Sequence, residues 1–164
     1  GASAHLVLKM IKSQFSDLEV YVFARNPRER DFARELGAVW AGDTPDQAPV
    51  TLEAVIDTTP AWKPVVEALK NLAPGGRLVI NAIRKEAGDQ DYLLNLDYSR
   101  DLWMEKEIKS VANVTRRDVR EFLDLAAGAG VEPVVQMFDL EDANQALREL
   151  KLGKIRGAKV LVMD

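Results

Sequence analysis

Short β-rich runs alternate with helical stretches along almost the whole chain, and this alternation constrains the fold more than any other sequence feature. Strand-like runs include EVYVFA at 19–24, AVIDT at 54–58 and RLVINA at 77–82. Parallel strands need long crossover connections, usually helices, so this order is typical of α/β domains. The sequence therefore predicts an α/β fold with a parallel sheet.

Capping signals and turn residues place the remaining elements. Asn26-Pro27 is typical of a helix start, and Thr115 with Asp118 resembles a capping box. Asp139 is expected to cap the last helix, and Pro74-Gly75-Gly76 is expected to form a turn. The other expected helices cover 2–13 and 60–72; the other expected strands cover 38–41, 107–112, 134–138 and 158–163, with a short extended piece at 92–96.

Length and composition exclude several classes of protein. The 164 residues suit one domain, or one domain plus a piece of another. The net charge of −4 argues against a nucleic-acid partner, and the chain has no cysteine and one histidine, too few for a thiolate or histidine-rich metal site. No apolar run approaches the roughly 18 residues that span a bilayer, and no signal peptide opens the chain. We therefore expect a cytoplasmic protein without a membrane partner.

Several stretches, in order, carry a resemblance to a known family. The opening GASAH resembles the end of a G-x-G-x-x-A loop, and LAPGGRLVINAI is similar to the turn and strand of an L-x-x-G-G-x-L-V-x-x-G motif. The tail FDLEDANQALRELKLGKIRGAKVLV resembles F-x-L-E-E-A-N-x-A-L-x-x-L-x-x-G-x-I-x-G-R-x-V-L, and RERDFARELGA and SVANVTR match two segments between. Together they resemble the cofactor-binding and C-terminal part of medium-chain, zinc-type alcohol dehydrogenases.

The resemblance implies a layout. It predicts a Rossmann-type doubly wound parallel sheet whose first strand precedes Gly1, with an NAD(P)-binding domain at 1–113 and a segment at 114–164 that returns to the catalytic domain. The catalytic half, with its zinc ligands, is expected before Gly1. The strands at 19–24 and 54–58 would then flank the place of the first strand. Made alone, the chain is expected to aggregate, swap strands or pair these edges; a gap of roughly 10 Å between them would mark an excerpt of a longer protein.

The resemblance also assigns a cofactor site. Small residues at the start of the chain would line the pyrophosphate: Gly1, Ala2, Ser3 and Ala4. After the second strand, Ala24 occupies the position of an acidic, NAD-selecting residue, and Arg25 and Asn26 follow, with Arg28 or Arg30 able to assist. A guanidinium there suits a 2′-phosphate, which favours NADP, with NAD possible. The structural alternatives are an ordinary helix start and an exposed arginine in a capping turn.

The nicotinamide half would lie beyond the next strands. The lining residues expected there are Thr58, Thr59, Pro60, Ala82, Ile83 and Arg84, with Asn113 bonding the carboxamide or acting only as a turn residue. Asn81 departs from an often apolar position, and the family's G-R pair is Gly157-Ala158 here. Asp57 is expected to tie down neighbouring backbone, and His5 to pack or to hydrogen-bond locally. No catalytic residue is assigned within this chain.

The implied function is hydride transfer between a nicotinamide cofactor and a small alcohol or carbonyl substrate, in a homo-oligomer whose zinc is held by the other half. Three alternatives stay open at this point. A zinc-free NADPH quinone or enoyl reductase of the same superfamily is the nearest. A stand-alone nucleotide-sensing domain needs a complete first strand, and a methyltransferase needs an acidic residue where Ala24-Arg25 stand.

Overall fold

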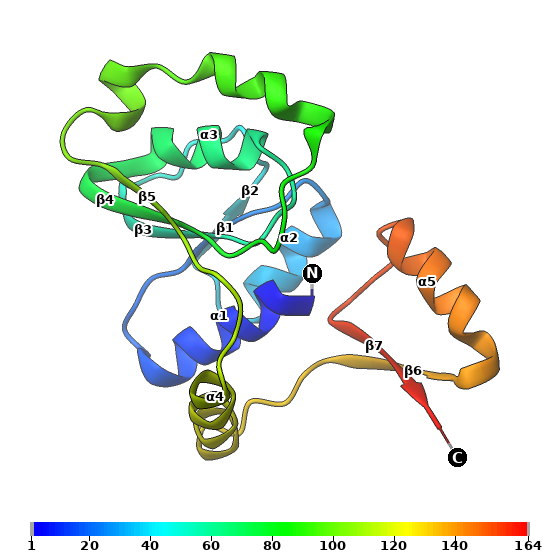
Figure 1. Cartoon of the computed structure of the whole chain (residues 1–164). Coiled ribbons are helices and arrows are strands. Elements are labelled where there is room, and N and C mark those ends of the chain that lie inside the picture. Colours follow the sequence, from blue (N-terminus) through cyan, green and yellow to red (C-terminus); the bar gives the residue numbers. More distant parts are fainter. Residues whose placement is uncertain (1, 164) are drawn as a thin grey trace.

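The computed structural model describes residues 2–163, and within this range the strands form three separate parallel sheets (Figure 1). The first contains β1 (Tyr21–Phe23) and β2 (Trp40–Gly42), and the second contains β3 (Leu52–Asp57), β4 (Leu72–Ile80) and β5 (Glu107–Ser110) in the order β3-β4-β5. The third contains β6 (Val135–Asp139) and β7 (Ala158–Val162). The predicted α/β architecture with parallel strands is confirmed.

Two helices pack around the first sheet. They are α1 (Ala2–Gln14) and α2 (Pro27–Glu35), and Asn26 caps α2 because its side chain accepts a hydrogen bond from the Arg28 amide at 3.0 Å. Leu8 of α1 is buried against Ala33, Ala38 and Ala41. Small side chains on α2 and β2 therefore let α1 approach closely.

The second sheet has its own core. The helix α3 (Lys63–Asn71) buries Val65, Leu69 and the strand residue Leu78, the last two with no exposed surface. In Figure 1, α3 lies on one side of this sheet and α1 on the other. The segment after β4 folds over α3 as η1 (Ala87–Asn95) and η2 (Tyr98–Leu102).

Two expectations about this region are wrong. Residues 92–95 belong to the helix η1 rather than to an extended piece, and η1 packs against α3 instead of joining a sheet. Pro74-Gly75-Gly76 does not precede the strand but lies inside β4. There the pairing jumps from Leu52–Leu72 to Ala54–Arg77, so the extra residues form a bulge.

The C-terminal region begins with α4 (Arg116–Gly128). Its capping box is confirmed: the Thr115 hydroxyl accepts from the Asp118 amide, and the Asp118 carboxylate accepts from Thr115 at 2.7 Å. These bonds also hold the pKa of Asp118 below its ordinary value. Asp139, by contrast, makes no side-chain cap, because η3 (Leu140–Asp142) intervenes before α5 (Ala143–Lys151).

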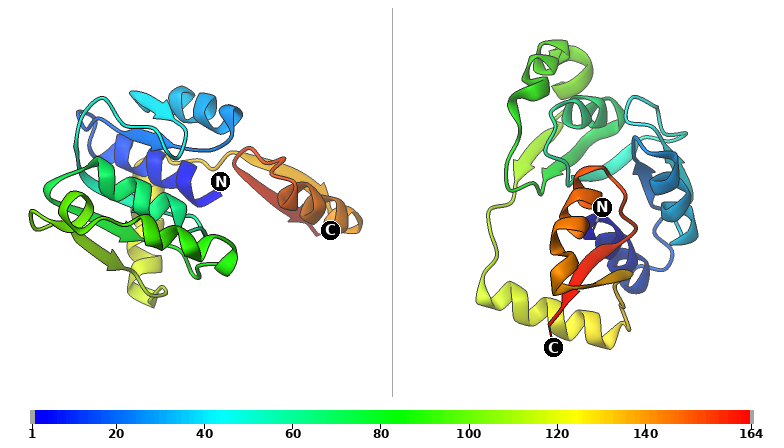
Figure 2. Two further views of the ribbon diagram at one scale, coloured as in Figure 1. Left: turned by 90° about the horizontal axis from the view of Figure 1, so that it is seen from above. Right: turned by 90° about the vertical axis from the view of Figure 1, so that its right-hand side faces the viewer.

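Figures 1 and 2 show β6, α5 and β7 as a unit beside the rest of the chain. Contacts from α1 and α2 reach the segments that flank it: Lys9 Nζ donates to the Glu132 carbonyl at 2.6 Å, and Arg156 pairs with Glu35. His5 packs in the interior, as expected, 6.0 Å from the Phe32 ring centre, and its Nε2 also accepts a long-range bond from the Val134 amide at 3.4 Å. Gly157 permits the close approach here, because a Cβ would lie 2.0 Å from the Val134 carbonyl oxygen.

The family resemblance predicts that the edges of β1 and β3 flank a central strand. Among the described residues, β1 pairs only with β2, and β3 pairs only with β4. The structure therefore does not realise the outcome in which these two edges pair with each other.

The start of α3 gives a stability prediction. Asp89 accepts hydrogen bonds from the amides of Trp62 and Lys63 at 2.9 and 2.8 Å, and these bonds lower its pKa. We expect Asp89→Ala to cost about 1 kcal/mol of unfolding free energy at neutral pH, as for other lost N-caps. Since the folded-state pKa is depressed, this contribution exists above the ordinary carboxyl pKa and disappears as the pH falls through the folded value.

Urea unfolding at neutral and acidic pH tests this prediction, with Asp91→Ala as a control at an exposed carboxylate in the same segment. An equal effect of the two substitutions would contradict it.

None of the helices in the described part of the chain is long and apolar enough to cross a bilayer.

Candidate functional site

A pocket lies where the N-terminal turn of α1 meets the carboxyl ends of β3 and β4. Its volume is about 260 Å³, and its lining residues are Ser3, Thr58, Pro60, Asn81, Ala82, Ile83 and Arg84. Ligand pockets usually enclose about 300–1,000 Å³, so this one is smaller than a typical ligand pocket. Segments far apart in the sequence thus converge on one concave surface.

The fold explains why these residues meet. Parallel strands end at the same edge of a sheet, so the loops after β3 and β4 emerge side by side. The third wall is a helix N-terminus, whose free amides and positive dipole end favour an anion. The first turn of α1 contains no acidic side chain to offset that end. The pocket therefore combines two backbone loops with a site that favours phosphate.

A buried ion pair joins the two loops behind the pocket. Lys85 Nζ pairs with Asp57 Oδ2 and donates to the carbonyls of Thr59 at 2.9 Å and Ala61 at 2.8 Å. The Asp57 side chain is 4% exposed and that of Lys85 is 10% exposed. As the sequence suggests, Asp57 ties down backbone: its Oδ1 accepts from the Thr59 amide at 3.1 Å. Two backbone bonds at 2.7 Å, Asn81 N to Asp57 O and Glu86 N to Pro60 O, complete the connection.

The turn between β1 and α2 forms a second part of the candidate site. Arg30 Nη1 donates to the carbonyls of Ala24 at 2.7 Å and Arg25 at 3.1 Å, which fixes the turn. Asn26 is occupied as the α2 cap, and Arg25 is exposed. Arg25 is thus the guanidinium of this turn that faces solvent, whereas Arg30 holds the backbone.

The predicted site residues fall into three groups. The pocket brings together Ser3, Thr58, Pro60, Ala82, Ile83 and Arg84. Ala4 lies on α1 but outside the lining, as do Arg25, Asn26 and Arg30 at the other turn, Thr59, whose hydroxyl bonds Asp57, and Asn113, whose side chain accepts from the Val114 amide. Ala2 belongs to α1, and Gly1 lies outside the described residues.

No motif or spacing in the sequence predicts a role for Lys85. It follows Arg84 in a polar stretch, where a lysine is ordinarily solvated, and only the fold brings it to Asp57. Asn81 stands at an often apolar position, for which the sequence suggests no role, and the structure places it in the pocket wall.

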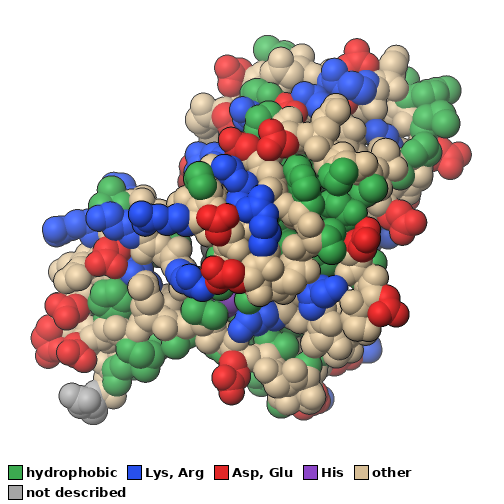
Figure 3. Space-filling view, turned by 180° about the vertical axis from the view of Figure 1, so that it is seen from behind, with side chains coloured by type: hydrophobic (Ala, Val, Ile, Leu, Met, Phe, Trp, Pro, Cys, Tyr) green, Lys and Arg blue, Asp and Glu red, His purple; other side chains and the backbone are tan. Residues whose placement is uncertain are grey.

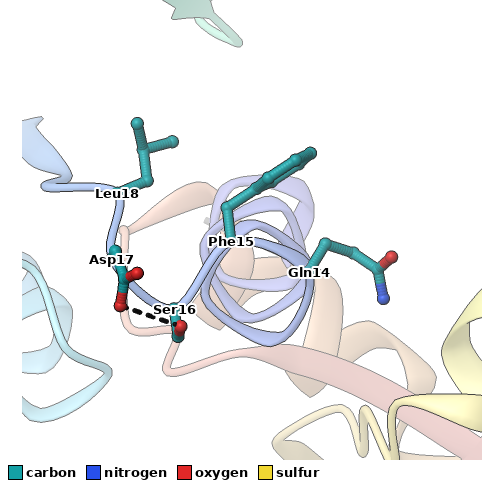
Figure 4. Close-up of a pocket in the computed structure, with 5 residues that line it drawn as sticks. All are labelled: Gln14, Phe15, Ser16, Asp17 and Leu18. Carbon is teal, nitrogen blue, oxygen red and sulfur yellow. Dashed lines mark hydrogen bonds between the residues drawn. The ribbon is translucent and has the colours of Figure 1, made fainter.

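A larger concave surface, about 500 Å³, lies at the end of α1 but lacks the features of a site. It is formed by five consecutive residues, 14–18, and Figure 4 shows Gln14, Phe15 and Leu18 pointing in different directions. The one hydrogen bond drawn there joins Ser16 and Asp17 at 3.1 Å. No second element contributes a polar group, so we assign no function to this surface.

Basic and acidic side chains are interspersed on the face that Figure 3 shows. Within residues 2–163, no cluster of three or more His, Cys, Asp or Glu side chains is arranged to hold a metal ion. The zinc implied by the family resemblance therefore does not fit a site built from these residues.

Comparisons with known proteins point to one family. The chain is 36% identical over 163 residues to the probable alcohol dehydrogenase AdhA of Mycobacterium tuberculosis, covering 99% of this chain and 45% of that protein. It is 26% identical to an alcohol dehydrogenase of Geobacillus stearothermophilus, covering 98% of this chain and 48% of the relative. The chain thus spans about half the length of the curated relatives it matches. No family model matches it.

Solved structures share the fold. A cinnamyl alcohol dehydrogenase from Sorghum bicolor matches with a TM-score of 0.77 at 23% identity, covering 96% of this chain and 44% of that one. The yhdH oxidoreductase from Salmonella enterica, solved in complex with NADP, matches with a TM-score of 0.72 at 15% identity, covering 100% and 52%. The chain is thus similar in sequence to about half of the length of these alcohol dehydrogenases, and it shares its fold with the solved structures.

Proposed function

We propose that this chain supplies the nicotinamide-dinucleotide-binding part of an NAD(P)-dependent alcohol dehydrogenase, with NADP as the preferred cofactor. The observation that carries the proposal is the pocket between the N-terminal turn of α1 and the loops after β3 and β4. In open parallel sheets, ligands bind beyond the carboxyl ends of the strands, at the point where the connections diverge. The similarity to alcohol dehydrogenases over nearly the whole chain supports the same assignment.

The residues of this chain would bind and orient the cofactor. The amides at the start of α1, around Ala2, Ser3 and Ala4, would accept the pyrophosphate, because they present free donors at a positive dipole end. Thr58 and Pro60 on one side, with Ala82, Ile83 and Arg84 on the other, would hold the nicotinamide half. Asn113 follows β5 and is proposed to approach the carboxamide from the third loop.

The adenosine half would lie at the turn after β1. Ala24 offers no carboxylate to a ribose 2′-hydroxyl, and the exposed Arg25 offers a guanidinium to a 2′-phosphate. The bonds from Arg30 to the carbonyls of Ala24 and Arg25 would hold this backbone in place.

The bound cofactor supplies hydride chemistry, and the chain supplies position. We assign no catalytic residue within these residues and derive no step through zinc, for which they provide no ligand cluster in the described part. The proposal extends to a small alcohol, aldehyde or ketone substrate, to a zinc site contributed by other residues, to a homo-oligomer and to a cytoplasmic location.

Turnover by the protein that carries this chain tests the proposal. We expect oxidation of NADPH that depends on an added aldehyde or ketone, and reduction of NADP that depends on an alcohol. Activity only with quinones or enoyl compounds would instead identify a zinc-free reductase. Absence of any substrate-dependent nicotinamide chemistry, and of cofactor binding, would refute the proposal.

A further inference from the structure

The ion pair between Asp57 and Lys85 links the two loops that line the pocket. Lysine carries three N–H donors, and Lys85 directs them to the Asp57 carboxylate and to the carbonyls of Thr59 and Ala61. Its ammonium also lies 5.9 Å from the ring centre of Trp62. With its donors occupied, Lys85 is a fixed support rather than a group that exchanges protons with a substrate.

The loop after β3 alternates between this support and the pocket. Asp57, Thr59 and Ala61 bond to Lys85, whereas Thr58 and Pro60, the residues between them, line the pocket. Thr58 and Pro60 each lie between two residues that bond to Lys85, so these bonds restrict where Thr58 and Pro60 can lie in the pocket wall.

The loop after β4, which forms the opposite wall of the pocket, is also held by Lys85. Lys85 directly follows Arg84, and Asn81 to Arg84 line the pocket, so the anchored ammonium limits the loop after β4 as well. These loops contain no regular helix or strand between Asp57 and Lys63 or between Ile80 and Ala87. The bonds of Lys85 and the two backbone bonds at 2.7 Å join these loops.

A buried ion pair is a poor source of net stability, because desolvating both charges offsets most of their attraction. Its benefit is to fix one geometry. We propose that Asp57 and Lys85 are positioning residues that set the separation of the two pocket walls, and thereby the affinity for the nicotinamide half of the cofactor. This inference rests on the proposed function, since it concerns the same pocket.

The proposal predicts a loss of affinity confined to one half of the cofactor. In the protein that carries this chain, Lys85→Met should weaken NADPH binding by roughly 10- to 100-fold, as small displacements of positioning groups do. Adenosine 2′,5′-bisphosphate has no nicotinamide, so its affinity should be unchanged. Both dissociation constants are measured by fluorescence titration or calorimetry.

Removing Lys85 alone leaves Asp57 buried without its partner, which endangers the fold. The double variant Asp57→Asn with Lys85→Met removes both charges and keeps an acceptor for the Thr59 amide, so it separates positioning from stability. The matched control is Arg77→Met with Glu107→Gln, which removes the exposed ion pair between β4 and β5, 2.6 Å apart and outside the pocket lining.

We expect the double variant to lose NADPH affinity but keep that for adenosine 2′,5′-bisphosphate, and the control to keep both. Unchanged NADPH binding in a folded double variant would overturn the inference, as would an equal loss for both ligands or loss of the fold in both Lys85 variants. If the unmodified protein binds neither ligand, the proposed function itself fails, and the inference fails with it.

Discussion

Replacing Ala24 with aspartate should convert an NADPH-preferring protein into one that prefers NADH. Ala24 directly follows β1, where a carboxylate would accept the ribose 2′-hydroxyl of NADH and repel the 2′-phosphate of NADPH. Each charge-assisted bond is worth about 1.5–3 kcal/mol, so gaining one and opposing another should shift the affinity ratio by roughly 100-fold or more.

The local structure favours this substitution. Arg30 holds the turn through the backbone carbonyls of Ala24 and Arg25, and the Ala24 amide donates to the Gly42 carbonyl at 2.9 Å. A new side chain at position 24 removes none of these bonds. The turn should therefore keep its conformation while its charge changes.

Titration of both cofactors against the unmodified protein and Ala24→Asp measures the ratio. Ala24→Asn is the matched control, since it adds a similar volume without charge and should shift the ratio far less. Equal affinities for NADPH and NADH in the unmodified protein would contradict the predicted preference. An unchanged ratio in Ala24→Asp would show that the 2′ position of the ribose lies elsewhere.

A polypeptide consisting of residues 1–164 alone should have no alcohol dehydrogenase turnover and bind no stoichiometric zinc. Tetrahedral zinc sites in these enzymes need cysteine, histidine or carboxylate ligands in a cluster. The chain has no cysteine and one histidine, and His5 is buried at a bond to Val134. The expected effect is the complete loss of aldehyde-dependent NADPH oxidation.

Metal analysis of the purified polypeptide, together with an NADPH-oxidation assay, checks this prediction. NADPH binding by the same preparation is the necessary control, because it distinguishes a folded but inactive polypeptide from an unfolded one. Aldehyde-dependent turnover, with or without zinc, would require a catalytic group that we have not assigned.

Much of the fold was predictable because its signals are local. The Asn26 cap, the Thr115–Asp118 capping box and the strand-and-helix alternation depend on neighbouring residues. The bulge at Pro74-Gly75-Gly76 was not predictable in this way, because it depends on the register with Leu52 and Ala54. The position of η1 likewise depends on its packing against α3, which is a tertiary contact.

In the candidate site, too, the residues set by local signals were predictable and those set by tertiary contacts were not. Thr58, Pro60 and Ala82 to Arg84 were expected in one place, because strand ends in a parallel sheet share an edge. Lys85 was not expected, because its partners Asp57, Thr59 and Ala61 are set by tertiary structure rather than by spacing. Arg30 is predicted near a phosphate, and the structure adds that its Nη1 donates to the carbonyls of Ala24 and Arg25, a contact that spacing along the chain does not reveal.

A crystal structure of the protein that carries this chain, with NADPH bound, tests the central claim most directly. The account predicts pyrophosphate at the N-terminal turn of α1, nicotinamide between Thr58–Pro60 and Ala82–Arg84, and the 2′-phosphate within hydrogen-bond distance of Arg25. Cofactor bound at any other surface, or nicotinamide outside the pocket between the β3 and β4 loops, would contradict it.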